Sequence, residues 1–215
     1  AGSLAGRTLL EPAGGTGAFI EAAREAGITS VVSVDIEPHH PEVRHGDFLA
    51  VNLKLTQAVV ASNPPFGRNN ALSIPFFNRA ADMATHIAFI VPRSWRKWSV
   101  SNRLDPRFHL ASDRDLQINY VDVDGQPLSG KSVLRTCVQV WERRPTLRPI
   151  YTVRDMGVIL RCSPQDADVS LTVFGYGCGT VRTEFERVPN TTQAFLKLTH
   201  PDALDALRRA NVKRF

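Results

Sequence analysis

The sequence predicts an α/β fold: a doubly wound, mostly parallel sheet with an antiparallel hairpin at one edge, followed by a small β-rich C-terminal extension. Three observations predict it. Apolar, β-branched runs alternate with helical segments over the first ninety residues, which is typical of a parallel sheet covered on both faces. Two strands of alternating character then follow with no helix between them. Arg-Pro pairs at 144–145 and 148–149 finally mark the start of a strand-rich tail.

The expected elements follow in chain order. Strands of the parallel part are predicted from hydrophobic runs at 8–10, 30–34, 57–62 and 87–91, with a strand end at 45–48. Helices are predicted over 18–26 and 74–84, and a helix followed by a loop over 93–107. The hairpin strands are expected at 117–124 and 132–143, joined by turns at 125–127 and 130. Strands near 150–153, 168–174 and 194–198 precede a closing helix that starts at Pro201.

We therefore expect two domains, a core of residues 1–148 and an extension of residues 149–215 packed on it.

Composition excludes several classes of protein. The 215 residues are 43% hydrophobic and 22% charged, and the three cysteines form no CxxC pair. No apolar run approaches the ~20 residues of a membrane span. A membrane protein, a disulfide-rich miniprotein and a zinc finger are thus excluded, and we expect a cytoplasmic protein.

The distribution of charge says more than the net charge of +5. Residues 1–65 carry a net −3, residues 66–148 a net +6 and residues 149–215 a net +2. An acidic first third followed by a basic middle indicates two different binding surfaces.

The first candidate site is the glycine-rich turn 11–17 (EPAGGTG), between the first strand and the first helix. Glycines let the backbone turn sharply and let a ligand approach closely, and the following helix N-terminus offers free N–H groups. Ile20 stands where a dinucleotide-binding loop has its third Gly or Ala. The carboxylate of Glu11 would repel a pyrophosphate and suits a ligand that carries a positive amine.

Acidic residues also follow the next two strands. Asp35 lies 18 residues after Gly17, where an acidic side chain accepts hydrogen bonds from ribose hydroxyls. Asp47 is placed to accept from an adenine amino group, with Phe48 against the ring. Three acids after three successive strands predict a pocket for a cationic ligand that contains ribose.

The third candidate site is the segment 62–66 (SNPPF), directly after the strand at 57–62. A rigid Pro-Pro strand stop is the purely structural alternative, but open α/β sheets place their sites at such carboxyl ends. An exocyclic amine is a poor nucleophile because its lone pair is delocalised. Asn63 and the Pro64 carbonyl can each accept one of its N–H groups and so localise that lone pair, and Phe66 can stack on the planar group.

With these motifs in order, residues 8–142 resemble a class I S-adenosylmethionine-dependent methyltransferase, whose sheet has seven strands in a Rossmann-like arrangement. The segment 63–66 (NPPF) is similar to the catalytic motif of amino-methyltransferases and is most familiar in adenine-N6 nucleic-acid methyltransferases. The resemblance implies S-adenosyl-L-methionine as cofactor and adenine N6 in DNA as the target. The implied catalytic residues are Asn63, Pro64, Pro65 and Phe66. The implied cofactor-binding residues are Glu11, Pro12, Gly15, Gly17, Asp35, Ile36, Asp47, Phe48 and Asn63.

Such enzymes usually have a segment before the first strand that closes over the cofactor. Only about seven residues precede that strand here, so we expect either that the sequence is trimmed at this end or that the covering segment comes from elsewhere.

The basic middle of the chain supplies a candidate nucleic-acid surface. Arginines and a lysine interleaved with two tryptophans fit phosphate contacts combined with base stacking; the expected residues are Arg68, Arg93, Trp95, Arg96, Lys97 and Trp98. A solvated helix with one Trp packed in the core is the alternative. His39, His40 and His45 are interpreted as surface turn residues, and no metal is expected.

Two other functions stay open. The same fold could methylate RNA, a guanine amine or a protein glutamine, although the basic middle makes a protein substrate less attractive. Alternatively, the chain could be a methyltransferase-like subunit that binds nucleic acid without turnover.

Overall fold

The computed structural model describes residues 6–118, 120, 126, 135–152 and 154–210. The chain divides into two compact units, Ala1–Tyr151 (unit 1) and Thr152–Phe215 (unit 2). The sequence analysis placed the boundary after residue 148. The predicted hairpin connection lies outside the described residues, apart from Gln126.

Unit 1 is built on a sheet whose described strands number seven, in the order β3-β2-β1-β4-β5-β7-β6. The strands are β1 (Thr8–Glu11), β2 (Ser30–Asp35), β3 (Val43–His45), β4 (Ala58–Ser62), β5 (Ala84–Pro92), β6 (Phe108–Leu116) and β7 (Thr136–Arg143). Strands β1 to β5 pair in parallel, and β7 runs antiparallel to both β5 and β6. The predicted mostly parallel sheet with an antiparallel edge hairpin is therefore confirmed.

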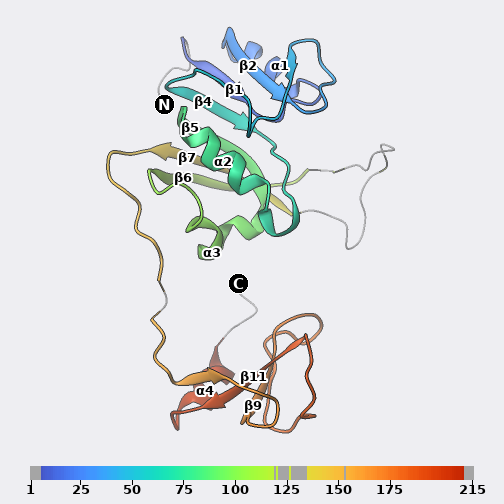
Figure 1. Cartoon of the computed structure of the whole chain (residues 1–215), viewed down its shortest axis with the longest axis vertical. Helices are drawn as coiled ribbons and strands as arrows, with labels where there is room; N and C mark the ends of the chain where they lie inside the picture. Colours follow the sequence, from blue (N-terminus) through green and yellow to red (C-terminus); the bar gives the residue numbers. More distant parts are fainter. Residues whose placement is uncertain (1–5, 119, 121–125, 127–134, 153, 211–215) are drawn as a thin grey trace. The chain divides into compact units, whose positions relative to one another are not determined.

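Helices cover both faces of this sheet because successive strand residues point to opposite sides. Helix α1 (Ala18–Glu25) packs on the side of Leu9, and helix α2 (Ser73–Ala81) packs on the side of Leu10 (Figure 1). The short helices η1 (Arg68–Asn70), η2 (Arg93–Arg96) and α3 (Trp98–Ser101) follow strand ends. Within the described part of the chain, no helix has the length and apolar character needed to cross a membrane.

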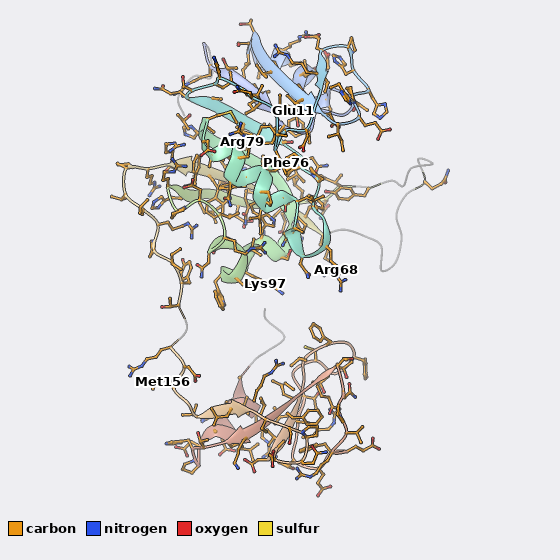
Figure 2. The ribbon with its side chains drawn as sticks, in the orientation of Figure 1. Glu11, Arg68, Phe76, Arg79, Lys97 and Met156 are labelled. Atoms are coloured by element: carbon orange, nitrogen blue, oxygen red, sulfur yellow. The ribbon has the colours of Figure 1, made fainter. Side chains whose placement is uncertain are left out.

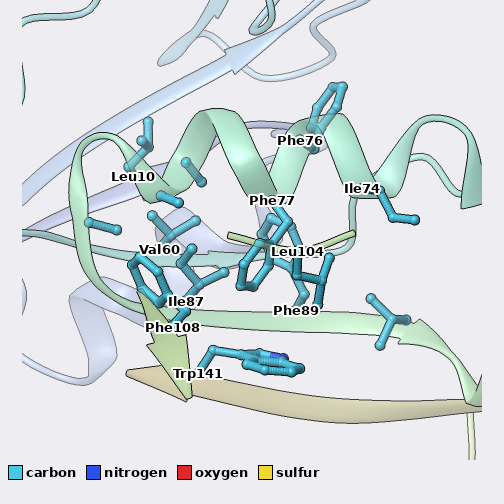
Figure 3. Packing of buried hydrophobic residues seen from close by; sticks show 14 of the residues in the cluster. Leu10, Val60, Ile74, Phe76, Phe77, Ile87, Phe89, Leu104, Phe108 and Trp141 are labelled. Carbon is cyan, nitrogen blue, oxygen red and sulfur yellow. The ribbon is translucent and has the colours of Figure 1, made fainter. Parts of the chain in front are cut away.

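The core under α2 is centred on one phenylalanine. Phe77 is fully buried, and four aromatic rings surround it edge to face at centroid distances of 5.6–6.0 Å; they belong to Phe89, Trp95, Phe108 and Trp141. Figure 3 shows Phe77 with the rings of Phe89, Phe108 and Trp141 around it. Edge-to-face contacts add favourable quadrupole interactions to the burial of apolar area. One side chain of α2 thus ties together β5, η2 and both hairpin strands.

Three predicted elements of unit 1 need correction. The helix expected over 74–84 ends at Ala81, because Ala84 already pairs with Ala58 at the start of β5. The segment 93–107 holds only the short helices η2 and α3. The edge strand is β6, which ends at Leu116. Of the strand expected at 117–124, residues 117, 118 and 120 form no strand, and the others lie outside the described residues.

Strand β6 was missed because its sequence, FHLASDRDL, alternates poorly. It is an edge strand, and two of its carboxylates, Asp113 and Asp115, form ion pairs with arginines of η2. A polar run in the sequence is therefore compatible with a strand here.

Unit 2 has a four-stranded antiparallel sheet in the order β10-β9-β11-β8. Its elements are β8 (Ile159–Arg161), β9 (Val169–Thr172), β10 (Val181–Arg182), β11 (Gln193–Leu198) and α4 (Ala203–Arg209). Leu204 and Leu207 of α4 pack with Val169 and Leu196. The extension is β-rich as predicted, but residues 150–152 form no strand.

We predict that Phe77→Ala lowers the free energy of unfolding of unit 1 by about 3–5 kcal/mol, because it leaves a cavity among four aromatic rings. Urea unfolding followed by tryptophan fluorescence measures this directly, since all three tryptophans, at 95, 98 and 141, lie in unit 1. The matched control is Phe174→Ala in unit 2, where the ring is 68% exposed; this variant should unfold unit 1 at the wild-type urea concentration. Equal midpoints for the two variants would contradict this account of the core.

Candidate functional site

The main candidate site is a cavity of about 590 Å³ at the carboxyl ends of the parallel strands. Eight of the residues expected from the sequence line it: Pro12, Gly15, Asp35, Ile36, Asp47, Phe48, Asn63 and Pro65. Four expected residues do not line it: Glu11, Gly17, Pro64 and Phe66. The remaining wall comes from residues that the sequence reasoning missed: Ala13, Glu37, His39, Gly46, Leu49, Leu72 and Phe76.

The glycine-rich turn approaches its neighbours so closely that two of its glycines leave no room for a side chain. A Cβ on Gly14 would lie 2.1 Å from Ser33 Oγ, and one on Gly17 would lie 2.6 Å from His40 Cγ. Gly17 also precedes α1 with φ at +80°, a left-handed conformation that favours glycine. Gly14 and Gly17 therefore shape the turn, while Gly15 lies on the cavity wall.

Asp35 holds the turn in place with its carboxylate. Oδ2 accepts a hydrogen bond from the Gly15 N–H at 2.8 Å, and Oδ1 accepts one from the Glu37 N–H at 2.9 Å. Each oxygen keeps a second lone pair, so the carboxylate can still accept hydrogen bonds from a ligand in the cavity.

Asp47 and Phe48 form the opposite part of the wall. Asp47 Oδ1 accepts from the Leu49 N–H at 2.9 Å, which fixes the turn after β3. Phe48 is only 1% exposed and its ring lies 5.3 Å from that of Phe76 on α2. The two rings give this end of the cavity an apolar surface next to a carboxylate.

Glu11 is not among the residues that line the cavity. Its side chain is completely buried, Oε1 accepts a hydrogen bond from the equally buried Ser62 hydroxyl at 2.6 Å, and Oε2 has no partner. Burial raises the pKa of Glu11 from 4.5 to about 8, although the hydrogen bonds from Ser62 and from the Ala13 backbone oppose the rise. Glu11 thus links the ends of β1 and β4.

The loop after β4 presents one free amide at the cavity. The Asn63 side chain is exposed, and no described residue forms a hydrogen bond with it. Pro64 is buried behind it. A donor group in the cavity therefore has a free oxygen, Asn63 Oδ1, as an acceptor.

The rest of this loop is held by its own backbone. Gly67, Asn69 and Asn70 all have positive φ angles, which Gly and Asn tolerate best. The Phe66 carbonyl accepts from the N–H groups of Leu72 and Ser73, at 3.2 and 3.4 Å. The Asn70 amide donates to Ser94 Oγ at 3.3 Å, so the loop is joined to η2.

Part of the predicted nucleic-acid surface is not available. Trp95 is 1% exposed and donates from Nε1 to Ser73 Oγ, so it belongs to the core and the prediction that it stacks on a base is corrected. Arg93 pairs with Asp115 at 2.8 Å, and Arg96 pairs with both Asp113 and Asp115. No signal in the sequence indicated these partners, because β6 was predicted in the wrong place.

The other three predicted residues remain exposed. Arg68 and Lys97 project from unit 1 (Figure 2), and Trp98 is 51% exposed. These three are the part of the basic segment that can still meet a partner.

Solved structures with the same architecture include several methyltransferases. A candidate RNA methyltransferase from Pyrococcus horikoshii aligns with a TM-score of 0.51 and 16% identity, over 64% of this chain and 75% of its own. A candidate class I S-adenosylmethionine-dependent methyltransferase from Listeria monocytogenes aligns with a TM-score of 0.46 and 16% identity, over 70% of this chain and 59% of its own. For the 23S rRNA methyltransferase ErmE the TM-score is 0.43 and the identity 15%, over 68% of this chain and 64% of its own.

No protein-family model and no curated protein sequence matches the chain. The first of these likenesses, together with the strand order, shows that the chain contains a Rossmann-like methyltransferase fold.

We predict that the burial of Glu11 makes the protein less stable as the pH rises. The unfolded carboxyl loses its proton near pH 4.5, whereas the folded one keeps it up to about pH 8. Between these values the folded state binds more protons, so the free energy of unfolding falls by up to a few kcal/mol, and it levels off above pH 8. Glu11→Gln should remove this contribution. Denaturant unfolding of both proteins from pH 5 to pH 9 measures it, and parallel curves would contradict the assignment.

Proposed function

We propose that this protein is an S-adenosylmethionine-dependent methyltransferase that methylates an exocyclic amine, adenine N6 of DNA. The observation that carries the proposal is the free amide of Asn63 at the carboxyl end of β4, beside a cavity whose wall includes three acidic residues, Asp35, Glu37 and Asp47. The methyltransferase fold supports the same reaction class.

The cavity fits the cofactor that this fold implies. Its volume of about 590 Å³ lies within the ~300–1,000 Å³ typical of small-molecule sites. Asp35 retains acceptor positions for ribose hydroxyls, and Asp47 beside Phe48 suits an adenine amino group and ring. The buried carboxyl of Glu11 is neutral at pH 7, because burial raises its pKa to about 8, and a positive amine bound near it would favour its ionised form.

S-adenosylmethionine, when bound, supplies a methyl group on a sulfonium that is already a good leaving group. The chain's own residues have to position the acceptor and make it nucleophilic. Asn63 Oδ1 and the Pro64 carbonyl would each accept an N–H of the target amine, which localises its lone pair toward the methyl group. No strong base is needed before transfer, so placement and polarisation are the main contributions of the protein.

Phe66 would stack on the plane of the target base. A base inside a duplex cannot reach this loop, so the substrate must be flipped out or single-stranded. Arg68 and Lys97, exposed on unit 1, would contact phosphates and set the register of the strand. RNA is the second candidate substrate, because the solved structure that aligns at a TM-score of 0.51 is described as a candidate RNA methyltransferase.

We predict that Asn63→Ala lowers methyl transfer by at least about a hundredfold, the usual effect of losing one preorganised polar group at the reacting centre. Transfer of tritiated methyl to DNA, RNA and protein fractions measures activity, and calorimetry with S-adenosylmethionine should show nearly unchanged cofactor binding. The matched control is Asn52→Ala, since Asn52 is also exposed but does not line the cavity. Wild-type transfer by Asn63→Ala would refute the mechanism, and a wild-type protein that binds no cofactor would favour a non-catalytic binding subunit.

A further inference from the structure

Unit 1 has a second cavity, of about 250 Å³, which shares no lining residue with the cavity described above. It lies where the segment 95–101, the strands β6 and β7, and the segment 148–151 meet. We call it the edge pocket.

The rim of the edge pocket carries large apolar side chains that are left in contact with solvent. Trp98 is 51% exposed, Tyr151 57% and Leu110 44%. The backbone of Tyr151 is fixed by both ends of the Asn102 amide, which accepts from its N–H at 2.9 Å and donates to its carbonyl at 2.7 Å. The rim is therefore held in place although it is not covered, as expected of a preorganised binding surface.

The inner wall of the edge pocket is polar. Gln139, only 1% exposed, donates to Asp113 at 2.9 Å and accepts from the Trp141 indole at 3.2 Å. Arg96 donates to the same carboxylate, so these charges compensate one another.

Arg148 is the exception on this wall. It is 9% exposed and donates to the carbonyl oxygens of Ser101, Leu104 and Phe108, yet no carboxylate forms a salt bridge with it within the described residues. Its Nη1 is buried without a partner. A buried donor with no acceptor costs free energy, which a ligand with an acceptor atom would recover.

The edge pocket is connected to the Asn63 loop. Strands β4 and β5 pair in parallel, with Ser62 at the end of β4 opposite Phe89, and β5 continues to Pro92 before η2 begins. The hydrogen bond from Asn70 to Ser94 joins the loop after β4 to η2. Helix η2, whose residues Trp95 and Arg96 line the edge pocket, is thus tied to the loop that carries Asn63.

We propose that the edge pocket binds a nucleobase of the substrate strand close to the target nucleotide, stacked on Trp98 and Tyr151 with an acceptor atom toward Arg148. This inference rests on the proposed function, because it names a subsite for the same substrate. Aromatic walls with hydrogen-bonding groups behind them suit a planar heteroaromatic ring. Lys97, exposed and next to Trp98 in the chain, supplies a cation for the adjoining phosphate.

To test this proposal, the protein is titrated into a short single-stranded oligodeoxynucleotide that contains adenine and carries a dye. Fluorescence polarisation of the dye measures the binding affinity. Trp98→Ala and Tyr151→Ala should each weaken binding by about tenfold, the usual effect of losing one base–aromatic stack. Trp98→Phe should restore most of the affinity, because it keeps a flat ring. The matched control is Tyr176→Ala in unit 2, whose side chain is fully exposed and whose loss should leave binding unchanged.

The outcomes separate this inference from the proposed function. Wild-type affinity in both Trp98→Ala and Tyr151→Ala would overturn the edge pocket, even if the wild-type protein methylates the oligonucleotide. Weaker binding by both variants would support the pocket, even if the wild-type protein transfers no methyl group and the proposed function fails. An equal loss of oligonucleotide affinity in Tyr176→Ala would also overturn the edge pocket. So would a wild-type protein that binds no oligonucleotide and instead self-associates through Trp98. Calorimetry with S-adenosylmethionine checks that the variants keep an intact cofactor cavity.

Discussion

One buried hydrogen bond, from the Ser62 hydroxyl to Glu11, joins the two strand ends on which the candidate site is built. Strands β1 and β4 are neighbours, with Leu9 opposite Val59 and Leu10 opposite Val60, so the residues that follow them meet. The glycine-rich turn begins directly after Glu11 and the Asn63 loop directly after Ser62. Because both side chains are completely buried, neither loop can shift without breaking this contact or exposing a carboxyl group. The relative positions of cavity wall and Asn63 therefore depend on it.

Other polar side chains near the strand ends also hold the loops of the site in one conformation. Asp35 binds two backbone N–H groups, Asp47 binds one, and Asn70 binds Ser94. Asn63, in contrast, has no partner among the described residues and faces the cavity. To position an acceptor amine, a site needs supporting groups whose hydrogen bonds are already made and one amide that is left free for the amine.

The structure also shows where the acidic and the basic residues of the chain lie. Acids of the first third, Asp35 and Asp47, lie on the cavity wall. The basic middle is less available than its net charge suggests, because Asp113 and Asp115 on β6 compensate Arg93 and Arg96. Of the residues predicted to bind nucleic acid, Arg68, Lys97 and Trp98 remain exposed. Specific contacts, more than a general electropositive surface, would then determine how nucleic acid binds.

The parallel half of the fold and most of the cavity wall could be predicted because they depend on local signals. The sequence alone is enough to recognise the β-branched runs, the acidic residues that follow strand ends and the NPPF motif. Trp95 and Trp98 could not be told apart, since they lie in short helices with no periodic face, and only packing on Phe77 buries the first. Likewise, the burial of Glu11 depends on Ser62, 51 residues away in the chain. Gly14 is constrained by Ser33 on another strand, and no pattern in the sequence records that contact.

We propose that the site methylates the N6 amine of adenine in DNA. The most direct measurement incubates the protein with S-adenosylmethionine carrying a deuterated methyl group and a mixture of DNA, RNA and protein, then digests each fraction for mass spectrometry. This account predicts the label in N6-methyl-2′-deoxyadenosine. Label found only on guanine or on protein glutamine would contradict it, and so would the absence of label despite cofactor binding.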